Sequence, residues 1–156
     1  SENPAMVIFS ADCGGEDHRK DSLRNVEETG EFVVNIVGQA QFDAMNISSQ
    51  SYDYGDNEFL HAGLDMVESQ TVSPPRVGGV PAALECRLFQ TIPLPRSDSG
   101  QGYSLVMGTV TGIYVDDNMV SDGKLDYTAY TPISRLGYRD CGRVTGRCQG
   151  ARPDDK

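Results

Sequence analysis

The chain has 156 residues, of which 38% are apolar and 23% are charged. This length fits one domain, since domains hold about 100–200 residues, and the apolar content supports a core, which excludes a disordered or fibrous chain. The 23 Asp and Glu outnumber the 13 Lys and Arg, for a net charge of −10. Because phosphates repel an acidic surface, this balance excludes a general binder of nucleic acid or anionic membrane. We expect a soluble globular protein.

The chain has four cysteines and two histidines. None of the cysteines stands in C-x-x-C spacing, so we expect no metal site and interpret the cysteines as free thiols of a reducing compartment. The longest apolar runs, such as Ala5–Phe9, are far shorter than the ~20 residues that span a bilayer. No signal peptide is visible. These features predict a cytoplasmic protein without membrane association.

The first predicted elements are a strand, a short helix and a second strand. The apolar run Ala5–Ser10 is typical of a strand buried on both faces. Residues 20–30 predict a two-turn helix, with Asp21 or Ser22 as its cap and Gly30 in the left-handed conformation at its end. Glu31–Val37 alternates as a strand.

The next stretch predicts short, irregular elements. Gln39–Ser48 has apolar residues at helical offsets, the polar segment 49–56 is rich in turn residues, and Asn57–Leu64 predicts one helical turn closed by glycine. Asp65–Thr71 predicts an edge strand. Ser73–Val77 contains two prolines without amide protons, which favours an extended connector.

Two long alternating segments, Ala82–Ile92 and Ser104–Val115, predict a β-hairpin. In the first, Cys86 shares one face with leucines while Glu85 points to the other face. In the second, we expect Gly108 and Gly112 to share one face, where they allow bending or the close approach of a backbone or a ring.

The last segment dense enough to be structured is Thr131–Tyr138. From Gly142 onward the composition changes, so we expect a domain over residues 1–141 and a flexible tail over residues 142–156. Several strands with single short helices between them, without regular βαβ alternation, favour a mainly β fold: a β-barrel with peripheral helices.

An ordered series of short motifs resembles the flavin reductase-like FMN-binding split-barrel family. The series covers about residues 3–138 and comprises NPAMVIFS (3–10), KDSLRN (20–25), ETGEFVVN (28–35), AMN (44–46), EF (58–59), AGL (62–64), PPRV (74–77), ALEC (83–86), PI (132–133) and RLG (135–137).

The resemblance implies a homodimer of split β-barrels that binds FMN near the subunit interface, with NAD(P)H as the hydride donor. A partner monooxygenase that consumes reduced flavin is compatible with it. Family members begin with two further strands that contribute to the isoalloxazine site. This chain begins where the next strand begins, so we expect those opening strands to be missing.

The resemblance assigns the phosphate of FMN to the start of the first helix. A helix N-terminus offers free amides and partial positive charge to a phosphate. Lys20 would supply a charge and Ser22 a hydroxyl, while Asp21 is the better candidate for a capping or orienting group. The alternative is a capped surface helix with a solvated lysine.

Two further residues are candidates for cofactor binding. Asn46 would bond the ribityl or phosphate part of the flavin, or else take part in a local cap near Ser48 and Ser49. Arg135 would contact an anionic group or the pyridine nucleotide, or else is an ordinary surface arginine.

Two functions from different classes follow. The first is an oxidoreductase that transfers hydride from NAD(P)H to flavin, in which the cofactor supplies the chemistry and the protein supplies position. The second is a non-catalytic or electron-carrying flavoprotein module, or a truncated copy without a complete flavin site. The sequence names neither the electron acceptor nor the preferred nicotinamide nucleotide.

Overall fold

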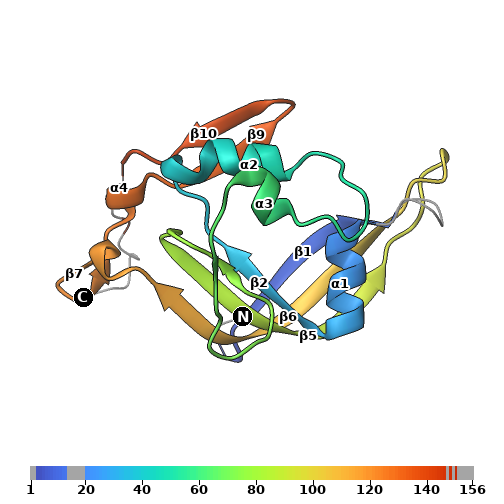
Figure 1. Ribbon diagram of the computed structural model, residues 1–156, viewed down its shortest axis with the longest axis horizontal. Helices are drawn as coiled ribbons and strands as arrows, with labels where there is room; N and C mark the ends of the chain where they lie inside the picture. Colours follow the sequence, from blue (N-terminus) through green and yellow to red (C-terminus); the bar gives the residue numbers. More distant parts are fainter. Residues whose placement is uncertain (1–2, 14–19, 147, 149, 151–156) are drawn as a thin grey trace.

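The computed structural model describes residues 3–13, 20–146, 148 and 150, and its centre is a four-stranded antiparallel sheet (Figure 1). The strand order is β1-β6-β5-β2. The strands are β1 (Met6–Asp12), β2 (Glu31–Asn35), β5 (Ala82–Pro93) and β6 (Tyr103–Val115). The sheet is curled, and short helices lie around it. The mainly β architecture with peripheral helices confirms the predicted fold class.

Strands β5 and β6 form the predicted hairpin, with Ala82 paired to Val115 and Pro93 to Ser104. Glu85 pairs with Gly112 and Cys86 with Val110, so β6 carries one extra residue, Thr111, at this point. Gly112 therefore faces Glu85 and Thr71 while Gly108 faces Phe32, and the expectation that the two glycines share a face is wrong. Glu85 and Cys86 point to opposite faces, as predicted, and Glu85 is nevertheless buried, at 3% exposure, because Gln70 and Thr71 cover it.

The core lies between the sheet and helix α1 (Asp21–Thr29), which buries Leu23 and Val26. Phe32 packs edge-to-face on Phe9, with ring centroids 5.4 Å apart. A Cβ at Gly108 would stand 2.3 Å from Cζ of Phe32, so the predicted close approach of a ring is confirmed. Burial raises the pKa of the core thiol Cys86 to about 11, so this thiol is protonated at neutral pH.

The remaining helices are short: η1 (Gln39–Gln41), α2 (Phe42–Ser48), α3 (Glu58–Ala62), η2 (Asp117–Met119) and α4 (Tyr127–Tyr130). Gly30 ends α1 and Gly63 ends α3, both in the left-handed conformation, as predicted. In Figure 1, α2 and α3 lie together above the open side of the sheet. Within the described part of the chain, no helix has the length and apolarity needed to cross a bilayer.

Three small two-stranded sheets complete the fold. They pair β3 (Met66–Val67) with β4 (Arg76–Val77), β7 (Val120–Ser121) with β8 (Lys124–Leu125), and β9 (Ile133–Gly137) with β10 (Asp140–Arg143).

These small sheets correct two boundaries. The predicted edge strand over residues 65–71 is only two residues long, and residues 70–74 form a series of bends without strand pairing. The predicted tail begins inside a strand: Gly142 and Arg143 pair with β9. Of that predicted tail, residues 147, 149 and 151–156 lie outside the described residues.

Candidate functional site

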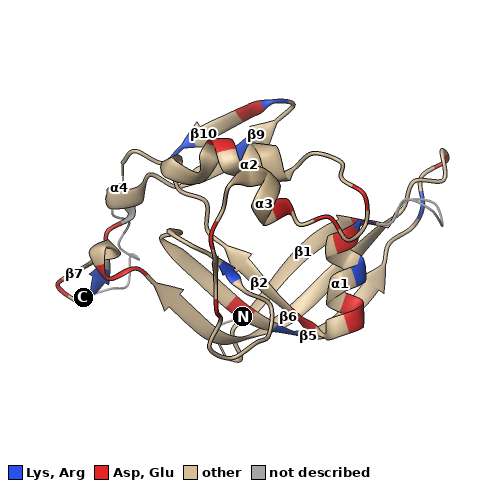
Figure 2. Cartoon of the chain, in the orientation of Figure 1, with Lys and Arg blue, Asp and Glu red and all other residues tan. Residues whose placement is uncertain are grey.

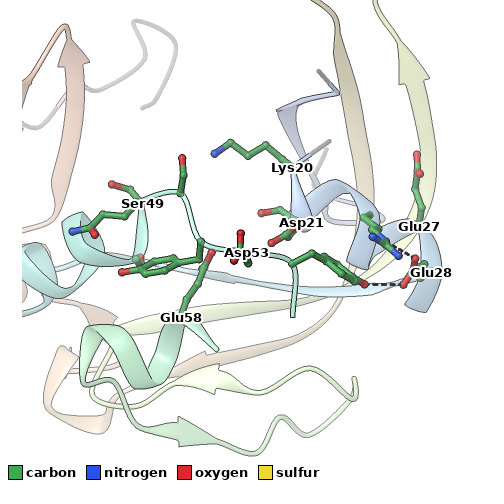
Figure 3. Close-up of a pocket in the computed structure, with 14 residues that line it drawn as sticks. Lys20, Asp21, Glu27, Glu28, Ser49, Asp53 and Glu58 are labelled. Atoms are coloured by element: carbon green, nitrogen blue, oxygen red, sulfur yellow. Dashed lines mark hydrogen bonds and ion pairs between the residues drawn. The ribbon is translucent and has the colours of Figure 1, made fainter. Parts of the chain in front are cut away.

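A polar groove of about 1180 Å³ opens at the N-terminus of α1 (Figure 3). One wall is the first two turns of α1, and the other is the segment that joins α2 to α3. The lining residues are Lys20, Asp21, Ser22, Arg24, Glu27, Glu28, Ser48, Ser49, Gln50, Ser51, Tyr52, Asp53, Tyr54 and Glu58.

The start of α1 carries backbone donors without intrahelical partners. Lys20 is the N-cap residue, and its carbonyl accepts hydrogen bonds from the amides of Leu23 and Arg24 at 3.0 and 3.2 Å. The N-cap residue Lys20 makes no side-chain cap bond, and Asp21 and Ser22 are the first two residues inside the helix, so the expectation that one of them is the cap is wrong. The amides of Asp21 and Ser22 donate no hydrogen bond to any of the described residues. The amides at the first turn and the helix dipole favour an anion at this position.

The charges around the groove are mostly negative. Five carboxylates line it, those of Asp21, Glu27, Glu28, Asp53 and Glu58, against two basic side chains. Arg24, one of the two, pairs with Glu28 at 2.9 Å. Figure 2 shows acidic positions on α1 and along the segment before α3. The attraction for an anion is therefore confined to Lys20 and the helix end.

Two tyrosines hold the segment between α2 and α3 in place. The Arg24 guanidinium lies 3.6 Å from the ring centre of Tyr54, whose hydroxyl donates to Glu28 at 3.3 Å. The ring of Tyr52 stacks on His61, with centroids 4.4 Å apart. Sequence reasoning predicted only a turn-rich segment here. The two tyrosines among polar residues were the available indication that this segment is anchored.

An apolar pocket of about 900 Å³ adjoins the polar groove and shares Ser22, Ser48 and Glu58 with it. Its other lining residues are Phe9, Asn25, Val26, Thr29, Glu31, Phe32, Val33, Val34, Asn35, Phe59, Leu64, Ser73, Pro74, Pro75 and Val77. A mostly apolar cavity with a few polar groups at one end is typical of small-molecule and cofactor sites.

The structure brings together three of the five predicted site residues. Lys20, Asp21 and Ser22 line the groove, and Figure 3 shows Lys20 extending over it from the α1 side. Asn46 is exposed on α2, where its carbonyl accepts from Ser49 Oγ at 2.7 Å. Arg135 is exposed on β9 and donates to the carbonyl of Tyr138. Neither of these two lines the groove or the pocket.

Three comparisons identify what the chain is similar to. An uncharacterised protein of Halalkalibacterium halodurans is 34% identical over 140 residues, 90% of this chain and 67% of the relative. Nitrilotriacetate monooxygenase component B of Bacillus cereus superposes with a TM-score of 0.87 at 28% identity, over 96% of this chain and 73% of that chain. The 2-nitrobenzoate 2-nitroreductase of Pseudomonas fluorescens superposes with a TM-score of 0.82 at 25% identity, over 100% of this chain and 73% of that chain.

The family model described as the flavin reductase like domain matches residues 1–134. The match covers both walls of the groove and all four strands of the central sheet. The chain therefore belongs to the flavin reductase-like split-barrel family of flavin-related oxidoreductases.

Proposed function

We propose that this protein binds FMN and transfers hydride from NAD(P)H to it, as a flavin reductase-like oxidoreductase. One observation carries the proposal: a groove at a helix N-terminus shares three lining residues with an adjacent apolar pocket. FMN has matching parts, a phosphate at one end and a flat aromatic ring system at the other.

The residues at the start of α1 fit a phosphate. Two backbone amides lack acceptors among the described residues, and Lys20 adds a full positive charge beside them. Ser22, which lines both cavities, can donate its hydroxyl. The carboxylate of Asp21 accepts rather than donates, so its role is to orient neighbouring donors. These groups would hold the phosphate while the apolar pocket excludes water around the ring.

Bound flavin would supply the redox chemistry, because its ring accepts hydride. The protein is left with positioning and shielding. Asn46 and Arg135 lie outside both cavities. Their proposed contacts, with the ribityl part and with the nicotinamide nucleotide, therefore require a ligand that extends beyond the groove and the pocket.

The proposal includes a homodimer, a cytoplasmic location and a partner monooxygenase that takes up reduced flavin. The similarity to component B of nitrilotriacetate monooxygenase supports such a partner. Size-exclusion chromatography with light scattering tests the dimer, with twice the mass of one chain as the expected result.

A second candidate is an electron-carrying flavoprotein module that does not react with NAD(P)H. The five carboxylates of the groove favour it, because they repel a second anion that approaches a bound flavin phosphate. In this case the protein would bind flavin and would be reduced by a protein partner.

Titration with FMN, followed by anaerobic addition of NADH or NADPH, separates the two candidates. The oxidoreductase predicts quenching of flavin fluorescence, then bleaching of the oxidised flavin band by the nucleotide. The electron carrier predicts quenching without bleaching. A chain that quenches no flavin fluorescence contradicts both. Lys20→Met should weaken binding, while Lys124→Met, an exposed lysine on β8, serves as the matched control.

A further inference from the structure

The segment 69–75, the strap, joins β3 to β4 and descends from α3 in Figure 1. It has no strand pairing of its own. Ser69 Oγ donates to the carbonyl of Pro74 at 2.6 Å, which closes the strap on itself, and Val72 is buried at 8% exposure. The position of the strap therefore depends on side chains that reach it from other elements.

Glu85 on β5 binds the first part of the strap. Its Oε1 accepts the amide of Gln70 at 2.9 Å, and its Oε2 accepts the amide and the hydroxyl of Thr71 at 2.6 and 2.7 Å. The hydroxyl of Thr111 lies 2.7 Å from that of Thr71. A Cβ at Gly112 would stand 2.9 Å from Glu85 Oε2, so this arrangement requires a glycine there.

Burial raises the pKa of Glu85, but the hydrogen bonds from Gln70 and Thr71 outweigh it, and the pKa lies below its ordinary value. The nearby charge of Arg76 acts in the same direction. Glu85 is therefore ionised at neutral pH, and each of its bonds to the strap is strengthened by charge.

Glu31 on β2 binds the second part of the strap. Its Oε2 accepts the amide of Ser73 at 2.8 Å, and its Oε1 lies 3.5 Å from Nε of Arg87. Arg87 in turn donates to the carbonyl of Thr71 at 3.3 Å. Two carboxylates and one guanidinium thus hold four backbone groups of the strap, on Gln70, Thr71 and Ser73.

The held segment is also a wall of the apolar pocket. Ser73, Pro74 and Pro75 line this pocket, and so does Glu31 itself. Any displacement of the strap therefore changes the shape of the pocket. The start of α1 is held separately, because the amides of Leu23 and Arg24 bond to the Lys20 carbonyl.

We propose that Glu85 and Glu31 are positioning residues that hold the strap as a fixed wall of the apolar pocket, so that binding of the flavin ring depends on both carboxylates. The inference rests on the proposed function, because a flavin is the ligand whose affinity it sets. Glu85 acts through the strap and touches no part of the pocket.

Hydrogen exchange measured by mass spectrometry tests whether the glutamates hold the strap. In Glu85→Gln one acceptor oxygen becomes a donor that faces the strap amides, so exchange over residues 69–75 should accelerate by at least roughly tenfold. Exchange over α1 should not change. Glu68→Gln, an exposed carboxylate just before the strap, is the matched control and should behave as wild type.

Substitutions of Thr71 test the same contact from the other side. Thr71→Val removes the hydroxyl that binds Glu85 and should accelerate exchange of the strap, whereas Thr71→Ser restores the hydroxyl and should return exchange to the wild-type rate. This pair also decides the question if Glu85→Gln does not fold. If the strap amides exchange at the wild-type rate in both Glu85→Gln and Thr71→Val, the proposal is overturned.

Titrations with FMN and riboflavin test the consequence for the pocket. Glu85→Gln should weaken the binding of both flavins by the same factor, because the phosphate end of the site is unaffected. Faster strap exchange with unchanged affinity for both flavins overturns the positioning role. Wild-type protein that binds neither flavin overturns that role together with the proposed function, while the exchange data still decide whether the glutamates hold the strap.

Discussion

The guanidinium of Arg24 lies 3.6 Å from the centre of the Tyr54 ring and joins α1 to the segment that forms the opposite wall of the groove. Tyr54→Ala should release this wall and weaken FMN binding by about two- to fivefold, since an exposed cation–π contact contributes about 0.5–1 kcal/mol. Fluorescence titration measures the loss.

Two variants control this prediction. Tyr54→Phe keeps the ring and loses only the hydrogen bond to Glu28, so it should bind FMN nearly as wild type does. Tyr138→Ala removes a tyrosine that is 97% exposed and should have no effect. Equal losses in Tyr54→Phe and Tyr54→Ala would assign the effect to the hydroxyl and contradict the cation–π account.

Gly108→Ala should destabilise the fold. The added Cβ would stand 2.3 Å from the Phe32 ring, inside the core. Forcing extra volume into a packed core costs about 1–3 kcal/mol, which urea unfolding measures as a lower midpoint. Gly146→Ala, where the added Cβ meets nothing within 4 Å, is the control. A double variant with Phe32→Leu should recover part of the loss, and no recovery would speak against this contact.

Lys20→Met should reduce FMN affinity by about ten- to a hundredfold, because a charge-assisted contact to phosphate contributes about 1.5–3 kcal/mol. Riboflavin, which lacks the phosphate, should bind as before. Added salt should weaken FMN binding to wild type more than to Lys20→Met. If the variant loses affinity for both flavins equally, Lys20 does not contact the phosphate.

Acid should remove the stabilising effect of the two strap carboxylates. Hydrogen bonds from Ser73 lower the pKa of Glu31, and the pKa of Glu85 is also below the ordinary value of 4.5. As the pH falls, the two carboxylates are therefore protonated in the unfolded chain before they are protonated in the folded chain. Their stabilisation of the fold is fully present above about pH 4.5, and it is lost as the pH falls through their pKa values in the folded chain.

Unfolding free energies of wild type and Glu85→Gln, compared from pH 7 to pH 3, measure this effect. The difference between the two proteins should be largest near neutral pH and should shrink below about pH 4.5. A difference that stays constant with pH would show that the ionised form of Glu85 is not what holds the strap.

The regular elements were predictable because local chemistry determines them. Gly30 and Gly63 end their helices in the left-handed conformation that glycine adopts most easily, and the alternation of residues 82–92 and 104–115 predicted the hairpin. The order of short motifs along the chain predicted the family. The predicted start of the first helix, at Lys20 and Ser22, is where the structure has the polar groove.

The long-range contacts were not predictable from the sequence. The extra residue Thr111 turns Gly112 to the face opposite Gly108, and alternation carries no information about such shifts. Glu85 is buried because the strap covers it, a contact that the strand pattern does not show. The partner of Tyr54 is on α1, 30 positions away in the sequence, so only the folded chain shows that the polar segment is anchored. Pro74 and Pro75 indicated a connector but not what holds it.

The most direct test of the account is an FMN titration of the ¹⁵N-labelled chain followed by amide NMR. We expect the amides of Asp21 and Ser22 to shift furthest and to saturate with FMN, because they would donate to its phosphate, while riboflavin leaves them nearly unchanged. Saturable shifts confined to other regions, with these two amides unmoved by FMN, would contradict a flavin phosphate at the start of α1.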